Sequence, residues 1–417
     1  MYNNNTINQR EVYKLVEKLS SGKYDNHREL LTSLIKEIVE HSEFEITGGR
    51  LWELDADNET YILKYQFGNM KRIPDEYTIH LDDDPEMFHR IEAERTLLKY
   101  ETDSVLKAKG INVFSVTGVG EMIKINHNTC YEYLLGFNAP EILQTFFEIL
   151  SIISSVATIA LRNISEEEKS QKIKTDIVKA SEIQSNLLPE HSVKFHDYDV
   201  YGVCIPESGV GGDYFDYLKS DNNEEESLGI VLSDAASSGL PAAIQALFVS
   251  GAIRMGKSFS TKITQLISRL NTLIFETFFY ERFVTLFYCE LTLSSNRLIL
   301  YCNAGHCPPI HYRPETDQFK LLGSTGGLLG LMQYQKFGVE NITMHPGDVL
   351  LLYTDGITEA RNKDGKMFGE DRLFDLIREH HDKSPKDISL YILESVEHFA
   401  SKSSYTDDKT LVVIKRN

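Results

Sequence analysis

Four short acidic segments are the parts of this sequence whose residue types and placement could do chemistry together. They lie at residues 211–216, 230–239, 349–356 and 405–410, and their carboxylates are Asp213, Asp216, Asp234, Asp355, Asp407 and Asp408. Each carboxylate stands where an expected strand ends or a turn begins. A carboxylate at the end of an apolar strand costs free energy unless it is solvated, paired or bound to a cation. Several such ends converging predict an oxygen-rich site for Mg²⁺ or Mn²⁺.

Two divalent cations at such a site would do hydrolytic chemistry. A neighbouring pair can share one water, lower its pKa and direct it at phosphorus. Glycines beside the acidic residues, such as Gly212 and Gly356, leave room for backbone, metal and phosphate to approach closely. Each segment alone is weak evidence, because an Asp-Gly after a strand is usually a turn. The order and strand context of all four segments together make the prediction specific.

Alternating apolar strands and helices are expected to position these carboxylates in the C-terminal half of the chain. Strands are expected at residues 198–205, 228–233, 284–293, 297–303 and 348–354, and helices at 241–255, at 263–278 and, as a pair, between 372 and 400. Paired strands separated by paired helices favour an α-β-β-α sandwich over a parallel doubly wound sheet. The expected fold class is therefore α+β, with this sandwich over residues 191–417.

The same segments resemble the bacterial SpoIIE/RsbU branch of the PPM (type 2C) serine/threonine phosphatases. The resemblance rests on residues 210–216 (VGGDYFD), 303–306 (NAGH), 350–362 (LLLYTDGITEARN) and 407–410 (DDKT). Residues 180–189 (ASEIQSNLLP) look like the helix that enters that family's catalytic domain. These motifs occur in order from about residue 176 to the C-terminus. The resemblance implies a metal-dependent hydrolase that uses two Mn²⁺ or Mg²⁺ ions per catalytic domain.

The resemblance also implies a role for each candidate site residue. Asp234 would bridge the two metals, with the backbone carbonyl of Ala235 as a neighbouring ligand. Asp355 and Asp407 would hold one of the metals, and Asp213 would bind metal directly or through water. These four aspartates are the predicted catalytic residues.

Three features of the resembling region leave alternatives open. Asp216 and Asp408 are either further ligands or the caps of turns. The family usually has Gly-Asp-Val-Ser-Gly-Lys-Gly where residues 233–239 read SDAASSG, and loss of the lysine puts turnover or substrate preference in doubt. Asn303 and His306 form a structural turn, or His306 acts as a general acid. We favour the turn.

Residues 1–164 are expected to form a separate α+β domain. A helix with Leu30, Leu34 and Ile38 on one face comes first. Strand-like stretches follow at residues 49–54, 60–65, 112–116, 121–125 and 130–135, and a long helix begins near Pro140. This order is similar to that of GAF domains, which are sensor modules. The domain would either bind a small ligand in a pocket or serve as a ligand-free dimerisation scaffold.

A connecting helix is expected over residues 165–190. Its apolar stripe recurs at alternating steps of four and three residues, which is typical of a heptad pattern, and consists of Ile173, Ile177, Ala180, Gln184 and Leu187. Because the stripe spans only about two heptads, it is either the seam of a dimer or a face packed on its own domain. We expect a homodimer.

Composition and charge indicate the compartment and exclude some partners. The chain has 417 residues, of which 41% are hydrophobic and 25% charged, and its formal net charge is −19. Because an acidic surface repels phosphates, we expect neither nucleic acid nor a membrane as the partner. The N-terminus shows no basic region followed by an apolar stretch, so we expect a cytoplasmic protein without a secretory signal. The five cysteines form no CxxC pair and are expected to be reduced thiols.

The expected substrate is phosphoserine or phosphothreonine on a regulatory protein. In the resembling family this protein is often a phosphorylated anti-sigma-factor antagonist, and the N-terminal domain would control activity in response to a small-molecule or protein signal. Two rival hypotheses stay open. The site would instead cleave a small phosphorylated metabolite or nucleotide, or the chain would be an inactive pseudophosphatase that acts as a binding module.

Overall fold

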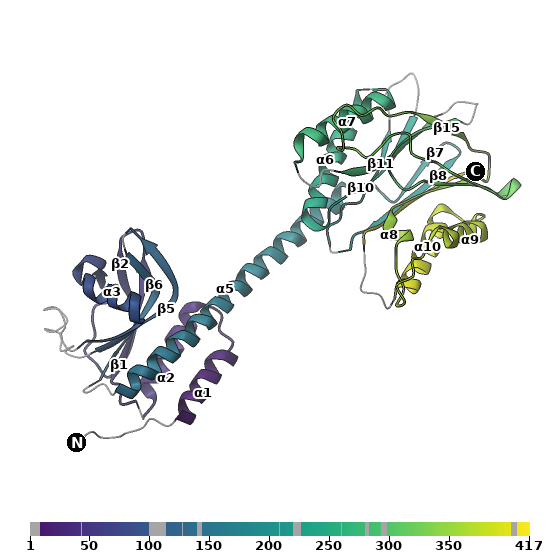
Figure 1. Cartoon of the computed structure of the whole chain (residues 1–417). Helices are drawn as coiled ribbons and strands as arrows, with labels where there is room; N and C mark the ends of the chain where they lie inside the picture. The colour runs from purple at the N-terminus through teal and green to yellow at the C-terminus, as the bar shows by residue number, and fades with distance from the viewer. Residues whose placement is uncertain are drawn as a thin grey trace. The chain divides into compact units, whose positions relative to one another are not determined.

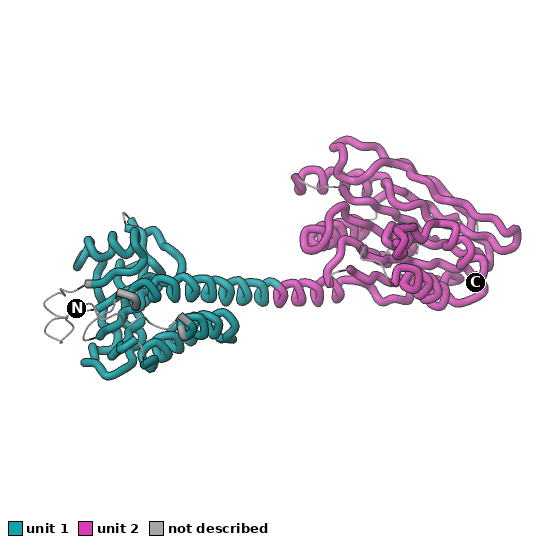
Figure 2. Tube along the Cα trace, turned by 60° about the horizontal axis from the view of Figure 1, so that its bottom comes forward, with its two compact units in different colours: residues 1–173 teal, residues 174–417 magenta. Residues whose placement is uncertain are grey.

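The computed structural model describes residues 9–42, 44–99, 114–126, 128–139, 144–207, 209–219, 227–259, 261–279, 283–292, 298–401 and 407–417. The chain divides into two compact units, Met1–Ile173 (unit 1) and Lys174–Asn417 (unit 2), which Figure 2 colours separately. Each unit has its own sheets and its own hydrophobic cores.

Unit 1 is built on one antiparallel sheet with the strand order β3-β2-β1-β6-β5-β4. Its elements in chain order are α1 (Gln9–Ser21), α2 (His27–Glu40), β1 (Gly48–Asp55), β2 (Thr60–Gly68), β3 (Thr78–His80), the short 3₁₀ turn η1 (Leu81–Asp83), α3 (Pro85–Glu94), β4 (Thr96–Lys99), β5 (Phe114–Ile125), β6 (Asn128–Asn138) and α5 (Gln144–Leu187). The two stretches expected at 112–116 and 121–125 form one strand, β5, although residues 112 and 113 lie outside the described residues, as does the expected helix start near Pro140.

Two hydrophobic cores flank this sheet. In one, side chains from α1, α2 and α5 pack together, and Leu31, Leu135 and Phe146 are fully buried in it. In the other, α3 packs, and Phe88 and Leu134 are buried. The adjacent residues Leu134 and Leu135 belong to different cores because side chains alternate along a strand. The mixed helix-and-sheet fold expected here is confirmed, and the GAF-like interpretation stays a prediction.

Helix α5 joins what the sequence suggested were two helices. It runs for 44 residues, and it contains neither proline nor glycine, so nothing in its sequence ends it before Leu187. The first half of the helix is rich in apolar residues, and some of them, such as Phe146 and Ile153, are fully buried in the core of unit 1. By length and composition alone, the segment Phe146–Leu187 is also apolar enough to cross a membrane. The apolar residues of this segment that are buried pack within unit 1, so their apolar side chains need no bilayer to account for them.

Unit 2 consists of two facing antiparallel sheets, each covered by helices on its outer side (Figure 1). Its elements are β7 (Ser192–Phe195), β8 (Tyr198–Ile205), β9 (Tyr214–Lys219), β10 (Ser227–Ala235), α6 (Gly239–Ser258), α7 (Ile263–Thr277), β11 (Val284–Thr292), β12 (Leu298–Ala304), β13 (Ile310–Arg313), the 3₁₀ turn η2 (Pro314–Thr316), β14 (Gln318–Leu321), β15 (Glu340–Thr343), β16 (Val349–Tyr353), α8 (Asp355–Thr358), α9 (Glu370–His380), α10 (Pro385–Ala400) and β17 (Lys409–Arg416). The first sheet has the order β15-β12-β11-β10-β9 and the second the order β14-β13-β16-β17-β8-β7.

The core of unit 2 has three layers that correspond to this arrangement. Side chains from both sheets form the central layer. Helices α6 and α7 pack on the first sheet, and α9 and α10 pack on the second. Strands β10 and β16 are buried along almost their whole length because each is covered on both faces. The α-β-β-α sandwich expected from the sequence is confirmed.

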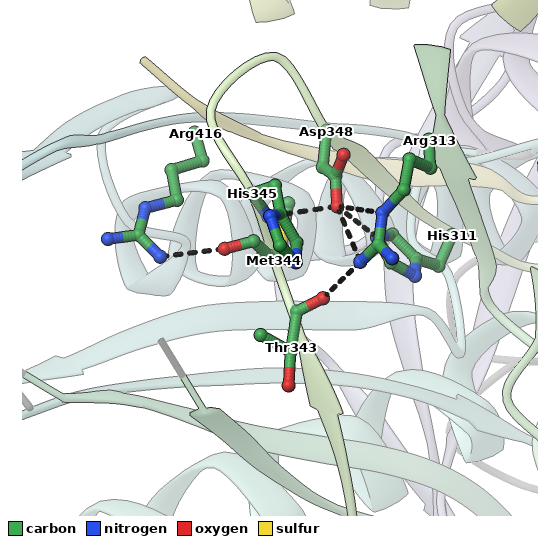
Figure 3. Close-up of polar contacts among 7 residues, drawn as sticks. All are labelled: His311, Arg313, Thr343, Met344, His345, Asp348 and Arg416. Atoms are coloured by element: carbon green, nitrogen blue, oxygen red, sulfur yellow. Dashed lines mark hydrogen bonds and ion pairs between the residues drawn. The ribbon is translucent and has the colours of Figure 1, made fainter. Parts of the chain in front are cut away.

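A buried charged cluster ties the two sheets together at one edge of the sandwich (Figure 3). Asp348, directly before β16, accepts hydrogen bonds from His311 Nε2 at 2.8 Å and from the His345 backbone N–H at 2.9 Å. Arg313 donates to the same carboxylate at 3.3 Å and to the Thr343 carbonyl at 2.8 Å. Since β13 and β15 belong to different sheets, Arg313 links them. The cluster uses its polar groups within the fold and is structural.

Candidate active site

A cavity of about 400 Å³ opens where strands of the two sheets of unit 2 end. Its lining is strongly acidic and consists of Glu207, Asp234, Ala235, Ala236, Ser237, Ser238, Gly239, Asp355, Asp407 and Asp408. Among the described residues, neither lysine nor arginine lines it. Three of the four aspartates predicted to be catalytic, together with Ala235, therefore share one cavity.

Each of these three aspartates is delivered by a different strand. Asp234 is the next-to-last residue of β10, in the first sheet. Asp355 begins the short helix α8 directly after β16, and Asp407 precedes β17, both in the second sheet. Since β16 and β17 are neighbours in register, the two carboxylates arrive from the same sheet edge. The cavity thus combines one carboxylate of the first sheet with two of the second.

The fourth predicted residue, Asp213, lies close to these aspartates but does not line the cavity. It directly precedes β9 and its side chain is buried. Its Oδ2 accepts a hydrogen bond from Thr354 Oγ1 at 2.8 Å, which fixes the carboxylate beside the residue that precedes Asp355. Direct or water-mediated contact between Asp213 and a metal stays a prediction.

Asp408 both lines the cavity and anchors the loop that carries Asp213. Its carboxylate accepts hydrogen bonds from the backbone N–H groups of Gly212 at 2.6 Å and Glu207 at 2.8 Å. A Cβ atom at Gly211 would lie 2.3 Å from Asp408 Oδ2, so the loop approaches this carboxylate closely only because residue 211 is glycine. The turn-capping alternative for Asp408 accounts for these contacts.

Asp216, the other uncertain acidic residue, points away from the cavity. It is buried, and it accepts from the Tyr214 hydroxyl and from Arg254 Nε, each at 2.5 Å. Arg254 belongs to α6, so the ion pair joins β9 to this helix. Asp216 therefore has a structural role and is no candidate ligand.

His306 is placed as part of a buried turn rather than in the cavity. Asn303 Oδ1 accepts from the His306 backbone N–H at 2.8 Å, and Asn303 Nδ2 donates to the carbonyls of His306 and Leu322. The His306 Nδ1 lies 2.7 Å from Thr285 Oγ1. Burial lowers the pKa of His306 to about 4, so the ring is neutral at physiological pH. These contacts favour the structural turn over the general-acid alternative.

The electrostatics of the cavity favour a bound cation. Burial and then the surrounding negative charges, beginning with Asp213, raise the pKa of Asp234. Burial also raises the pKa of Asp213, Asp355 and Asp407. Like charges that share a partly buried site repel one another, and an added cation offsets this repulsion.

The donor set is also of the right chemical type for such a cation. Carboxylates and a backbone carbonyl are the hard oxygen ligands of Mg²⁺ and Mn²⁺. Within the described ranges, no three acidic, histidine or cysteine side chains are already gathered around one point. We expect a bound cation to draw them together.

Comparison with known proteins shows which family shares this arrangement. Residues 224–417 match the family model described as "Stage II sporulation protein E (SpoIIE)". Residues 224–417 of this chain are thus similar to the SpoIIE family. Asp234, Asp355 and Asp407 all lie within this matched region, whereas Asp213 precedes it.

Two curated relatives and one solved structure are also similar to this chain. The chain is 27% identical over 246 residues to "Phosphoserine phosphatase RsbU" of Bacillus subtilis, which covers 59% of this chain and 71% of the relative. It is 25% identical over 245 residues to "Phosphoserine phosphatase RsbP" of the same organism, covering 58% of each chain. The SiaA-PP2C domain of Pseudomonas aeruginosa gives a TM-score of 0.50 at 18% identity, covering 60% of this chain and 99% of that domain. This last similarity is one of fold.

Proposed function

We propose that the chain is a metal-dependent phosphatase that hydrolyses phosphoserine or phosphothreonine on a protein. One observation carries this proposal: carboxylates from three strand ends of two sheets, Asp234, Asp355 and Asp407, line one cavity, and all three lie in the region similar to the SpoIIE family. The names of RsbU and RsbP, both phosphoserine phosphatases, support the same substrate group.

In the proposed mechanism, the chain's own residues hold and orient the reacting groups. Asp234, Asp355, Asp407 and the carbonyl of Ala235 would hold two Mn²⁺ or Mg²⁺ ions, with Asp213 contributing directly or through water. When bound, such a pair of ions supplies a water of lowered pKa and offsets charge on the phosphoryl oxygens. Thr354, through its hydrogen bond to Asp213, keeps that carboxylate turned toward the other aspartates.

The turn after β10 would contact the phosphoryl group. Ser237 and Ser238 line the cavity where the resembling sequences carry a glycine and a lysine. The Ser237 hydroxyl is buried and has no hydrogen-bond partner among the described residues, so a rotation of this side chain toward the cavity would let it donate to a phosphoryl oxygen. A hydroxyl donor in place of a lysine leaves the cavity without a fixed positive charge, which makes phosphate attraction depend on the metal ions.

The proposed partners are a phosphorylated regulatory protein and a second copy of the chain, in the cytoplasm. The substrate would be a protein such as an anti-sigma-factor antagonist, and unit 1 would set activity in response to a signal. A homodimer is supported by an exposed apolar stripe on α5, where Ile152, Ile159, Ile173 and Leu187 recur at multiples of seven residues.

A second candidate function is that of a binding module without turnover. The observation in its favour is the same turn, because the cavity contains neither lysine nor arginine within its described lining. Both candidates predict metal binding, so binding alone does not separate them. Turnover does.

Phosphate release by the purified full-length chain tests the proposed function. We expect release from a phosphoserine peptide with Mn²⁺ or Mg²⁺, no release with a chelator, and recovery when excess metal is restored. A phosphoprotein substrate should compete better than free phosphoserine or a nucleoside monophosphate. No release from peptide or phosphoprotein with either cation would contradict turnover, and preference for the small phosphates would contradict the substrate class.

A further inference from the structure

Unit 1 contains a cavity of its own, with a volume of about 200 Å³. Helices α2 and α5 and strands β5 and β6 line it, and most of the lining side chains are polar or charged, among them His27, Glu121, Glu132, Ser165 and Lys169. A polar group that is covered by an apolar molecule loses its water without gaining a hydrogen bond. The lining therefore favours a ligand that is itself polar.

A bulge in strand β5 forms part of the wall of this cavity. The register between β5 and β6 shifts here, so that Gly120 and Glu121 both lie opposite the single residue Glu132. Gly120 has a φ of +93°, and a Cβ atom there would lie 2.9 Å from Glu132 Cβ, so the bulge requires glycine. The Gly120 N–H donates to Thr158 Oγ1 of α5 at 3.1 Å. Bulges of this kind are frequent beside functional sites, where they redirect a side chain.

Glu132 and His27 place two hydrogen-bond acceptors side by side in the lining. His27 Nε2 lies 3.1 Å from the Leu161 carbonyl oxygen and 2.8 Å from Ser165 Oγ. Because a carbonyl can only accept, the hydrogen of the neutral ring is on Nε2, and Nδ1 carries a lone pair. His27 Nδ1 lies 3.6 Å from Glu132 Oε1. The Tyr133 hydroxyl, 3.3 Å from Nδ1, has a single hydrogen and can satisfy only one of these two acceptors.

Basic side chains of α5 supply the opposite charge. Arg162 and Lys169 both line the cavity, and Arg162 Nε already donates to Glu166 at 2.9 Å. Lys169 follows Ser165 by one helical turn, so the two residues lie on the same face of α5. A carboxylate on the ligand can therefore pair with Lys169. The cavity volume equals that of about seven water molecules in the liquid, so the ligand has roughly that many non-hydrogen atoms.

We propose that this cavity binds a free α-amino acid, with the ammonium group between Glu132 and His27 and the carboxylate beside Lys169. An ammonium group has three N–H donors, so it can donate to both neighbouring acceptors at once, and its charge pairs with the half-buried Glu132 carboxylate. The proposal does not depend on phosphatase activity. A purely structural role is the alternative: His27 would only join α2 to β6 and α5, and amino acids would not bind.

Calorimetric titration and melting temperature of the full-length chain with each standard amino acid test this proposal. We expect at least one to bind and to raise the melting temperature. Its methyl ester keeps the ammonium group without the carboxylate charge, and its N-acetyl derivative keeps the carboxylate without the ammonium group. Each derivative should bind about 10-fold or more weakly, because a hydrogen bond to a charged group is lost. Neither heat nor stabilisation with any amino acid would overturn the proposal, as would derivatives that bind as tightly as the parent.

Glu132→Gln and Lys169→Gln in the full-length chain locate the binding site. Each removes one charge and keeps a side chain of similar length, and Glu132→Gln should weaken binding by about 10-fold or more. Glu40→Gln and Lys172→Gln are the matched controls, since both residues are exposed in unit 1 and neither lines the cavity. The controls should bind as the wild type does. Lys169 is exposed, so its substitution should leave the ligand-free melting temperature unchanged. Binding that neither Glu132→Gln nor Lys169→Gln weakens would place the amino acid elsewhere and overturn the proposal.

Discussion

Replacing Asp234 with asparagine is expected to lower metal-dependent phosphate release by about 10²-fold or more, because even residues that only orient metal ligands typically change affinity or activity by 10–100-fold. Asparagine has nearly the same shape and keeps one oxygen, so the strand end that carries it should not move. The charge that would bridge two cations is lost. Release is measured with a phosphoserine peptide over a range of Mn²⁺ concentrations.

The same substitution should make the metal-free protein more stable. Neighbouring negative charges and burial raise the pKa of Asp234 in the folded chain. A carboxyl group whose folded pKa is raised costs stability once the pH exceeds its unfolded pKa, so at neutral pH its removal relieves repulsion. A gain of about 1 kcal/mol corresponds to a rise of about 2–4 °C in the melting temperature of a unit of this size.

Asp364→Asn is the matched control for Asp234→Asn. Asp364 is an exposed aspartate in the loop before α9, and the substitution makes the same chemical change outside the cavity. It should alter neither turnover nor the stabilisation that Mn²⁺ gives to the wild-type chain. An Asp234→Asn protein that kept full turnover and the full Mn²⁺-dependent rise in melting temperature would remove Asp234 from the site.

Gly356→Ala is expected to reduce turnover by about 10²-fold as well, because a misplacement of about 1 Å in a catalytic group can cost that much. A Cβ atom at this position would lie 2.0 Å from the Asp408 carbonyl oxygen and 3.3 Å from Asp407 Cβ. Real Cβ atoms do not approach a backbone oxygen so closely, so the 407–408 segment must shift. Asp407, a predicted ligand, shifts with it. Turnover and the Mn²⁺ requirement are measured together.

Gly251→Ala provides the control for that prediction. Gly251 lies within helix α6, and a Cβ atom there would meet nothing within 4 Å. The same glycine-to-alanine change should leave turnover unaltered and stabilise the helix by up to about 1 kcal/mol. Equal activity of the Gly356→Ala and Gly251→Ala proteins would show that the close approach at Gly356 does not position the site.

The strand ends that form the cavity could be predicted because local signals mark them. The apolar runs before Asp234 and Asp355 are long enough to be strands buried on both faces, and a carboxylate that ends such a run needs a partner. Convergence of these ends then follows from the sandwich. Even the outward orientation of Asp216 has a local signal: it shares the strand face of Tyr214 and Leu218, which pack toward α6 and α7.

Contacts between distant segments had no such signal. Asp408 accepts hydrogen bonds from the backbone N–H groups of residues about 200 positions earlier in the chain. Every residue except proline has a backbone N–H group, so the types of the residues do not show which of these groups will bind a distant carboxylate. Gln184 occupies a position of the predicted heptad pattern on the connecting helix. A polar residue at such a position indicates only a break in the apolar stripe. Its hydrogen bonds with the Gly211 backbone became visible only once helix and loop were placed together.

The most direct test of the central claim is to locate bound Mn²⁺ by anomalous diffraction in crystals of the full-length chain. We expect two peaks in the acidic cavity, with oxygens of Asp234 coordinating both ions and Asp355 and Asp407 coordinating one of them. Mn²⁺ that binds elsewhere, or peaks in the cavity that no oxygen of Asp234 contacts, would contradict the claim that this carboxylate organises a two-metal centre.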